Sequence, residues 1–487
     1  MIATKRGYEM HWKKLLSTKR LRSLMTGKRS REKKDHRTAF ERDYGRALFS
    51  TPVRRLQDKT QVFPLEPNDA VRTRLTHSHE VANVAHDLAR AVASFLHKKG
   101  VTYEQVDSIR TIARTCALIH DLGNPPFGHA GEGAISSWFE QKARSYFPDG
   151  EPSPDLRKSP LFKGFGAAQG YEGDFLEFEG NAQTLRLLAR LQIFAHDYGM
   201  NLTCATLSAA CKYVRSSKEP KKEDEHHERK KIGYFFSERD VIERLRDEVG
   251  TGDARHPITY LVEAADDIVY SSVDLEDGLR KGLYTWKQLE EWLREVGRRK
   301  GYFGDVNALL KKKNELIKDA DIKGSGRWPD EVQAQAFRTA FIAMAVERAA
   351  LCFEMRYDEI MAGSYHGELT SDTEFGGLVR VCKDIGREHV YNSTDTLRLE
   401  ILGRTVIHDL LDLFWEADPT AKKGTFAYKL WHLLSPNYRE VYRRSVEKYK
   451  LPEAYCRMQL LTDYIAGMTD TFATQLHRRL TNGGPDF

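Results

Sequence analysis

The sequence predicts an all-α protein with one large helical core and peripheral helical insertions. Apolar residues recur every three to four positions along most of the chain, which is the spacing of helix faces. The alternation of apolar and polar residues between turn dipeptides, which marks strands, is scarce. The chain has 487 residues, 40% of them hydrophobic and 30% charged, so it can bury a sizeable core. No internal repeat and no Pro/Ser-rich linker divides it, so we expect a single large domain.

Residues 1–40 are expected to form a basic, partly mobile arm, and residues 41–487 the folded domain. Trp12 and Leu24 are interspersed among the cations of the arm, which leaves open a nucleic-acid-binding regulator as one class of function. The net charge of +6 is a mild basic bias that fits an anionic ligand without specifying one. The cations of the arm are Lys13, Lys14, Lys19, Arg20, Arg22, Lys28, Arg29, Arg31, Lys33 and Lys34.

The first core helix is expected after the string RTRLT. One apolar face runs from Val81 to Phe95, and one turn before Val81 the same face carries His77. We therefore expect His77 to point into the core. The residues of this face are Val81, Val84, Ala85, Leu88, Val92 and Phe95.

The string CALIHDLGNPPFGHAGE ends a second helix, with His120 and Asp121 at the buried end of its apolar stripe. An ionised carboxylate at such a position must be paired or bound to a metal. The break at Gly123–Pro126 ends the helix, so that Phe127–Glu132 can fold back over the site. The stripe consists of Ile109, Ile112, Ala113, Cys116 and Ile119.

A third helix is expected in ITYLVEAADDIVYSSVDLEDGL. Its apolar stripe of Val262, Val269 and Val273 also contains Asp266, and Tyr270 lies one turn further along. A carboxylate again faces the core. A single inward polar residue is more often a hydrogen-bonded core residue than a ligand, but three helices share this feature.

Together these helices supply two imidazoles and two carboxylates, from His77, His120, Asp121 and Asp266. A mixed nitrogen and oxygen site with open positions suits Mn²⁺, Mg²⁺, Co²⁺ or iron better than a closed structural zinc site. The six cysteines contain no CxxC pair, which argues against a zinc knuckle, a redox motif or a disulfide framework. We therefore expect a catalytic metal site.

Two polar stretches are expected to be exposed loops: residues 216–231, SSKEPKKEDEHHERKK, and a segment near residue 320. No apolar run approaches the roughly 18 residues of a membrane span, and the first residues lack the apolar core of a signal peptide. We therefore expect a cytoplasmic protein without a membrane partner.

The order of His77, His120–Asp121 and Asp266 resembles the HD superfamily of metal-dependent phosphohydrolases. Longer strings, from about residue 40 to 480, closely resemble bacterial deoxyguanosine triphosphate triphosphohydrolases (dGTPases). The resemblance implies an HD core at about residues 70–280 and a C-terminal helical part at about 281–487. The strings are TPVRRLQDKTQVFPLEPNDAVRTRLTHSHEV, HDLGNPPFGHAGE, FEGNAQTLRLL, EAADDIVYSSVDLEDGL and DYIAGMTD.

The resemblance implies that water attacks the α-phosphorus of a deoxynucleoside triphosphate, with dGTP favoured, and releases the deoxynucleoside and inorganic triphosphate. Mg²⁺ or Mn²⁺, with Co²⁺ as an alternative, would be held by His77, His120, Asp121 and Asp266. The family uses the positions of His129 and Glu132 in proton transfer, which agrees with their i, i+3 spacing. The implied substrate residues are Arg55, Gln61, Val62, Asn181, Lys212, Tyr213 and Tyr270.

The resemblance also implies a homo-oligomer, with a hexamer favoured, and single-stranded DNA as a further ligand. Another HD-type nucleotide phosphohydrolase is the alternative within the superfamily. Guanosine tetraphosphate hydrolases resemble HDxxED, where this chain has HDLGN, and the GYP element of cyclic-dinucleotide phosphodiesterases has no counterpart in the equivalent context.

Overall fold

The computed structural model describes residues 9–28, 35–63, 65, 70–146, 173–192, 196–221, 226–319, 329–372, 374–392 and 394–481. Within these residues the chain is helical, and β-structure is limited to the isolated bridges Arg20–Thr203, Thr60–Thr73 and Arg215–Ile232. The predicted all-α fold is therefore confirmed. No described helix is both long and apolar enough to cross a bilayer.

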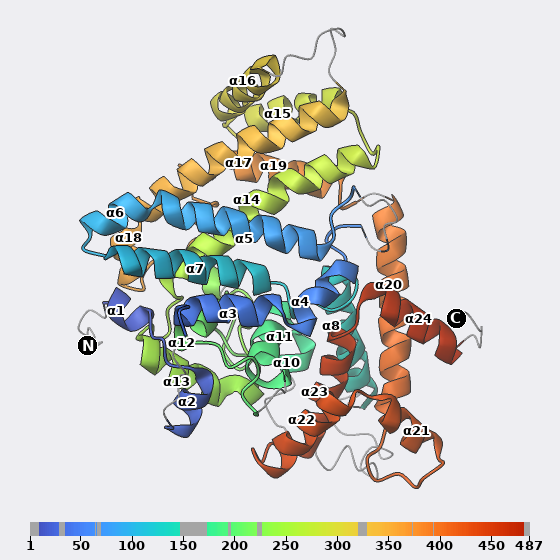
Figure 1. The fold of residues 1–487 in the computed structure, drawn as a ribbon. Coiled ribbons are helices and arrows are strands. Elements are labelled where there is room, and N and C mark those ends of the chain that lie inside the picture. Colours follow the sequence, from blue (N-terminus) through green and yellow to red (C-terminus); the bar gives the residue numbers. More distant parts are fainter. Residues whose placement is uncertain are drawn as a thin grey trace, which may run out of the picture.

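Four long helices form the centre of the molecule: α5 (Arg74–Ala91), α7 (Tyr103–Ile119), α14 (Pro257–Arg280) and α17 (Asp330–Met355). Figure 1 shows α5 lying between α7 and α14, and α5 packs along both. Side-chain caps set where two of these helices begin. The Thr73 hydroxyl accepts from the amide of Thr76 at the start of α5, and Thr102 forms a capping box with Gln105 at the start of α7.

Two further groups of helices surround this centre. One covers the far side of α7, and the other packs at the end of α7, where α8 and α20 lie against each other (Figure 1). The first group contains α3 (Ala39–Leu48), α12 (Cys204–Ala209) and α13 (Arg239–Val249). The second contains α8 (Gly128–Tyr146), α10 (Gly173–Leu176), α11 (Gly180–Arg186), the π-helical turn η3 (Leu187–Leu191), α20 (Thr394–Trp415), α22 (Pro436–Glu447), α23 (Glu453–Ala466) and α24 (Asp470–Thr481).

The remaining helices are peripheral, as the sequence predicts. In Figure 1, α15 and α16 lie at the opposite end of the molecule from α21 and α22. These helices are α1 (Trp12–Leu15), α2 (Leu21–Thr26), α4 (Thr51–Arg55), η1 (Leu56–Asp58), α6 (Ala93–Lys98), η4 (His227–Arg229), η5 (Phe236–Glu238), α15 (Trp286–Arg299), α16 (Phe303–Asp319), α18 (Tyr357–Met361), α19 (Gly377–His389) and α21 (Phe426–Leu433).

Part of the segment expected to be an exposed basic arm packs against the body of the protein. The Trp12 indole N–H donates to the hydroxyl of Tyr357 at 2.9 Å, and Trp12 is buried. Arg20 forms a buried ion pair with Asp43 at 2.8 Å. The physical reason is the interleaving of apolar with basic residues, because the apolar side chains bury while the lysines extend into water. Residues 1–8 and 29–34 of the arm lie outside the described residues.

Replacing Asp43 by Ala is expected to lower the free energy of unfolding by about 3–5 kcal/mol, because it removes one partner of a buried ion pair. The Asp43 carboxylate also accepts from the amide and hydroxyl of Thr203, so three donors lose their acceptor. Urea unfolding measures the change. The matched control is Asp358→Ala, at an ion pair with Lys99 where the aspartate side chain is 83% exposed, and it should change stability by less than about 1 kcal/mol. Equal losses of stability in Asp43→Ala and Asp358→Ala would contradict the packing of the N-terminal segment against the body of the protein.

Most apolar side chains of α23, near the C-terminus, are buried within the fold of the chain itself. Every residue of α23 except Glu453 and Arg457 is buried. Exposed apolar side chains instead lie on α20 and α24. They are Leu397, Ile401 and Leu402 on α20, and Phe472 and Leu480 on α24.

The two polar stretches differ in what the structure describes. Residues 320–328, in the segment near residue 320, lie outside the described residues. The stretch at 216–231 is described except for residues 222–225, and it contains the buried Glu228.

Candidate metal centre and active site

The ends of α5 and α7 and the middle of α14 bring three of the four predicted ligands together. The Nε2 atom of His77 lies 3.1 Å from Oδ1 of Asp266, and Nε2 of His120 lies 3.5 Å from the same oxygen. One ligand atom from each of these residues lies within 4.8 Å of the other two. Asp121 lies at the edge of this cluster, with Oδ2 3.3 Å from Nε2 of His120.

The donors fit a divalent cation on two observations. The Nε2 atom of His120 is buried without a hydrogen-bond partner, and its other ring nitrogen lies 2.6 Å from the carbonyl oxygen of Ala117. A proton on Nδ1 therefore leaves the Nε2 lone pair directed at the carboxylates, which is how metal-binding histidines are oriented. Burial lowers the His120 pKa, but the charges of Asp121 and Asp266 outweigh it and raise that pKa to about 10. The site thus attracts positive charge where a metal would lie.

Arg74 orients Asp121, and the sequence analysis missed it. Its guanidinium forms an ion pair with the Asp121 carboxylate, and its Nε donates to the carbonyl of Thr60 at 2.9 Å. The other Asp121 oxygen accepts from the side-chain amide of Asn124 at 2.9 Å. Burial raises the Asp121 pKa, but Arg74 and His120 hold it well below its usual range. Arg74 lies one turn before His77 on α5, so the helix spacing could have identified it.

The turn after Asp121 requires its glycines and one aspartate from far along the chain. A Cβ on Gly123 would lie 2.2 Å from the carbonyl oxygen of Gly180, so only glycine allows this approach. Phe127 and Gly128 have φ angles of 63° and 59°. Asp470, at the start of α24, accepts from the amide of Phe127 through one oxygen, at 3.0 Å, and from the amide of Thr60 through the other, also at 3.0 Å. The sequence analysis included Asp470 only as the last residue of the family string DYIAGMTD and gave it no role.

His129 and Glu132 form a hydrogen-bonded pair at the start of α8. Nδ1 of His129 lies 2.8 Å from Oε2 of Glu132, and Oε1 of Glu132 accepts from the amide of Gly180 at 2.8 Å. The His129 side chain is 83% exposed, whereas that of Glu132 is 9% exposed. The hydrogen bond to Glu132 raises the His129 pKa above its ordinary value. A buried carboxylate therefore holds an accessible imidazole through its Nδ1 atom.

Of the predicted phosphate-binding residues, Lys212 and Tyr213 lie near α14, whereas Arg55 ends α4 (Thr51–Arg55). Nζ of Lys212 lies 3.7 Å from Oε1 of Glu263, which is one turn before Asp266 on the same helix. Tyr213 is buried beside Lys212. Arg55 is exposed and donates to the carbonyl of Gly467 at 2.8 Å.

The predicted sugar-binding residues lie at two places in the fold. Tyr270 is half-buried one turn beyond Asp266, with Nζ of Lys383 5.3 Å from its ring centroid. Gln61 and Val62 follow η1 in the chain and are half-buried, and the Gln61 side-chain oxygen is buried without a hydrogen-bond partner. An unpartnered buried carbonyl is costly, so a ligand hydroxyl would stabilise it.

Comparison with known proteins places the chain in a family. A family model of the HD domain matches residues 74–149, and a model of a phosphohydrolase-associated domain matches residues 372–479. A deoxyguanosinetriphosphate triphosphohydrolase-like protein of Listeria innocua serovar 6a is 35% identical over 97% of this chain and 99% of its own length. Its counterpart in Listeria monocytogenes serovar 1/2a is 34% identical over the same shares. The chain belongs to the dGTPase-like family. It is thus a metal-dependent phosphohydrolase of the HD type.

The HD match of this dGTPase-like chain contains the predicted metal ligands on α5 and directly after α7, and the His129–Glu132 pair, but not Asp266. Asp266 comes from α14, more than a hundred residues beyond the matched segment, and only the packing of α14 on α5 and α7 brings it to the site. The periodicity of α14 was the signal that identified it.

A second cation that the sequence analysis missed is Lys231, in the stretch expected to be an exposed loop. Its Nζ lies 2.7 Å from Oε2 of Glu179, whose other oxygen accepts from the side-chain amide of Asn181 at 2.7 Å. Burial raises the Glu132 pKa, but His129 and Lys231 lower it below its ordinary value. Lys231 therefore acts electrostatically on the His129–Glu132 pair of the dGTPase-like chain.

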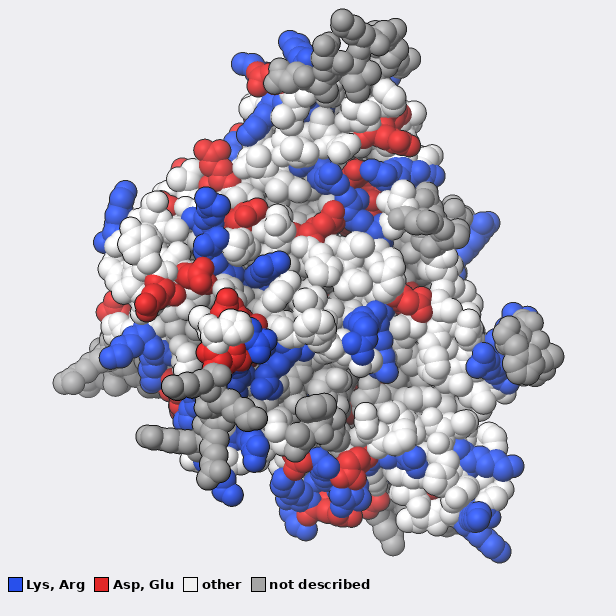
Figure 2. Space-filling model, in the orientation of Figure 1, with Lys and Arg blue, Asp and Glu red and all other residues white. Residues whose placement is uncertain are grey.

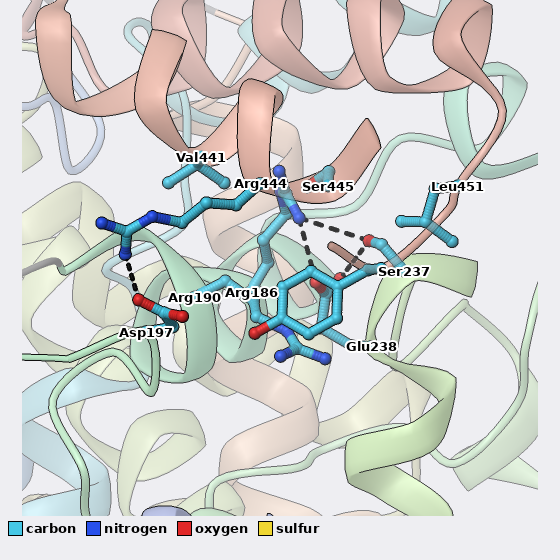
Figure 3. Close-up of a pocket in the computed structure, with 10 residues that line it drawn as sticks. Arg186, Arg190, Asp197, Ser237, Glu238, Val441, Arg444, Ser445 and Leu451 are labelled. Atoms are coloured by element: carbon cyan, nitrogen blue, oxygen red, sulfur yellow. Dashed lines mark hydrogen bonds and ion pairs between the residues drawn. The ribbon is translucent and has the colours of Figure 1, made fainter. Parts of the chain in front are cut away.

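Three arginines line a small cavity of about 20 Å³ elsewhere in the chain, and Figure 3 shows them around it. Each arginine is already paired: Arg186 with Glu238 at 3.0 Å, Arg190 with Asp240 at 2.8 Å and Arg444 with Asp197. Lys and Arg are also interspersed with Asp and Glu over the face in Figure 2, without one large basic field on that face. These features give no support to the nucleic-acid-binding alternative.

Proposed function

We propose that the protein hydrolyses deoxynucleoside triphosphates, dGTP foremost, to the deoxynucleoside and inorganic triphosphate. The observation that carries the proposal is the buried, unpartnered Nε2 of His120 among carboxylates, in one site with an accessible His129 held by Glu132. The names of the relatives support the substrate class.

A divalent metal, Mg²⁺ or Mn²⁺ with Co²⁺ as an alternative, would be held by His77, His120, Asp121 and Asp266, and would polarise an α-phosphate oxygen and the attacking water. Water then attacks the α-phosphorus while the bond to the 5′ oxygen breaks. His129 donates the proton that the departing 5′ oxygen needs, and Glu132 fixes the imidazole with Nδ1 as its donor. The Gly180 amide holds the second Glu132 oxygen.

The triphosphate carries several negative charges and is bound in this proposal by Lys212, Tyr213 and Arg55, with Asn181 in the wall of the site. Lys212 already lies beside the carboxylate of Glu263. A bound anion can therefore exchange places with that carboxylate as the partner of the ammonium group. Lys231 adds a second cation beside Glu179.

A panel of nucleotides assayed for inorganic triphosphate in the presence of Mn²⁺ tests the function. Release of triphosphate from dGTP supports the proposal. Release of orthophosphate or pyrophosphate instead would indicate another HD-type nucleotide phosphohydrolase. Salt-dependent retention of nucleic acid without hydrolysis would indicate a binding protein.

Replacing Tyr270 by Ala is expected to reduce the preference for dGTP over GTP by about 10–100-fold in kcat/KM. In the proposed pocket, the ring of Tyr270 lies against the sugar, so a 2′-hydroxyl loses its hydrogen bonds without gaining a partner, at a cost of about 1–3 kcal/mol. Gln61→Ala should weaken the use of every substrate with a 3′-hydroxyl, and Val62 closes the same pocket. Tyr270→Phe keeps the ring and should keep the preference. Equal discrimination in the wild type and in Tyr270→Ala would contradict the assignment.

We also propose single-stranded DNA as a ligand of the N-terminal basic residues. Separately, we propose a homo-oligomer, with a hexamer favoured, in which the exposed apolar residues of α20 and α24 lie between subunits. Light scattering of a dilute sample is expected to give several times the mass of one chain, and Ile401→Asp should reduce it, because Ile401 is 68% exposed. A fully active monomer would contradict the oligomer.

A further inference from the structure

Three potential metal ligands lie together outside the HD centre. They are His226 and Glu228 from the stretch at 216–231, and His366 from the segment between α18 and α19. Nδ1 of His226 lies 3.1 Å from Oε1 of Glu228, and Nδ1 of His366 lies 3.0 Å from the same oxygen. The amide of His227 donates to the carbonyl of His366 at 3.1 Å, so the two segments are joined along their backbones.

The carboxylate of Glu228 has two histidine neighbours but forms no ion pair with a lysine or arginine among the described residues. Glu228 is 4% exposed, and its second oxygen is buried with no hydrogen-bond partner. The nearby Arg255 is bound to Glu263 at 2.7 Å and to the carbonyl of Gly367 at 2.5 Å. Burying a carboxylate without a cation costs free energy, so a bound metal ion would stabilise Glu228.

The neighbouring cluster of His227, Glu263 and Glu368 differs because lysine and arginine side chains pair with one of its carboxylates. His227 lies 3.2 Å from Glu263 and 2.6 Å from Glu368, but Arg255 and Lys212 also pair with Glu263. Cations of the chain therefore balance those carboxylates. Of these two clusters, the first combines two imidazoles with a carboxylate that forms no ion pair with a lysine or arginine of the described chain.

We propose that His226, Glu228 and His366 bind a divalent transition-metal ion of the Zn²⁺ type. Two imidazole nitrogens and one carboxylate oxygen are ligands that such ions prefer, and three protein ligands leave a position for water. The histidine side chains are 22% and 37% exposed, so an ion can enter from solvent. The centroids of the two imidazole rings lie 4.0 Å apart.

The ion would act as a clamp between two segments that reach the active site. His227 and Glu368 alternate with the ligands along these segments, and Lys231 follows three residues after Glu228. Lys231 pairs with Glu179 beside the catalytic pair. The clamp would thus fix a loop whose cation acts on the chemistry, without contacting the substrate.

Zinc content tests the proposal without any assay of hydrolysis. Full-length protein is loaded with Mn²⁺, dialysed against limiting Zn²⁺, and analysed for both metals. Three variants are compared with the wild type: His366→Asn, Glu228→Gln, and the control His432→Asn at an exposed histidine on α21. Wild type and control should bind one more equivalent of Zn²⁺ per chain than the two ligand variants, whose Zn²⁺ affinity should be at least about 10–100-fold weaker.

Anomalous diffraction at the zinc edge then locates the ion, with a peak expected between His226, Glu228 and His366. Equal zinc content in all four proteins, or zinc found only at the HD centre, would overturn the proposal. Glu228→Gln preserves the size of the side chain, and circular dichroism confirms that each variant is folded before its zinc is counted. The result does not depend on which nucleotide the HD centre hydrolyses, because both readouts count metal.

Discussion

Asp266→Ala is expected to remove the metal of the HD centre and the hydrolytic activity together. Among the described residues, Asp266 is the one whose carboxylate lies within 3.5 Å of both His77 and His120. Without it, only the Asp121 carboxylate remains to offset a divalent charge, and Arg74 already occupies one of its oxygens. A bound cation supplies several kcal/mol of transition-state stabilisation, so activity should fall on the order of 10³-fold or more.

Metal analysis of the purified variant measures the first effect, and triphosphate release measures the second. The matched control is Asp87→Asn on the same bundle, where the side chain is 54% exposed, and it should keep both metal and activity. An Asp266→Ala protein with stoichiometric metal and normal turnover would show that the ligand set is wrong.

His129→Ala is expected to lower kcat by roughly 10²–10⁴-fold while metal content and nucleotide affinity stay unchanged, because it removes only the proposed proton donor. The side chain is 83% exposed, so its loss should disturb the fold little. The control His36→Ala changes a histidine whose side chain is 93% exposed and which is distant from α8 in sequence, and it should have no effect.

The pH profile provides an independent check of the same pair. The acid must be protonated, so activity is present below the His129 pKa and is lost as pH rises through it. The hydrogen bond to Glu132 raises that pKa. Glu132→Gln should therefore shift the alkaline limb of kcat to lower pH. A variant with an unchanged alkaline limb, or one that binds nucleotide poorly but turns over normally, would place the pair in phosphate binding instead.

The periodicity of the sequence was sufficient to predict the helices that carry the metal ligands. The stripes of α5, α7 and α14 bury their apolar residues, so a polar side chain on such a stripe also faces inward, as His77 does. Such patterns predict which face a residue occupies, but not its partners. Arg74 was missed because an arginine in a first turn is usually solvated.

Long-range contacts and irregular segments limited the rest of the prediction. Lys231 and Glu228 lie in a stretch with almost no apolar residues, where burial depends on ion pairs and turns made with distant segments. The Trp12 segment was expected to be exposed because of its charge, yet its few apolar residues were enough to bury it. Local composition does not encode such contacts.

The hydrogen bonds of Asp470 connect the turn at Phe127 to a part of the chain that is synthesised much later. Phe127 and Asp470 are 343 positions apart, so a ribosome releases the catalytic turn long before the residue that holds it. A left-handed φ at a non-glycine residue costs about 1–3 kcal/mol and persists only when its surroundings enforce it. A nascent chain therefore completes its catalytic turn only after α24 has emerged. For the same reason, we expect the HD segment to be inactive when it is transplanted alone, because the proposed proton-transfer pair follows a turn that Asp470 holds from the far end of the chain.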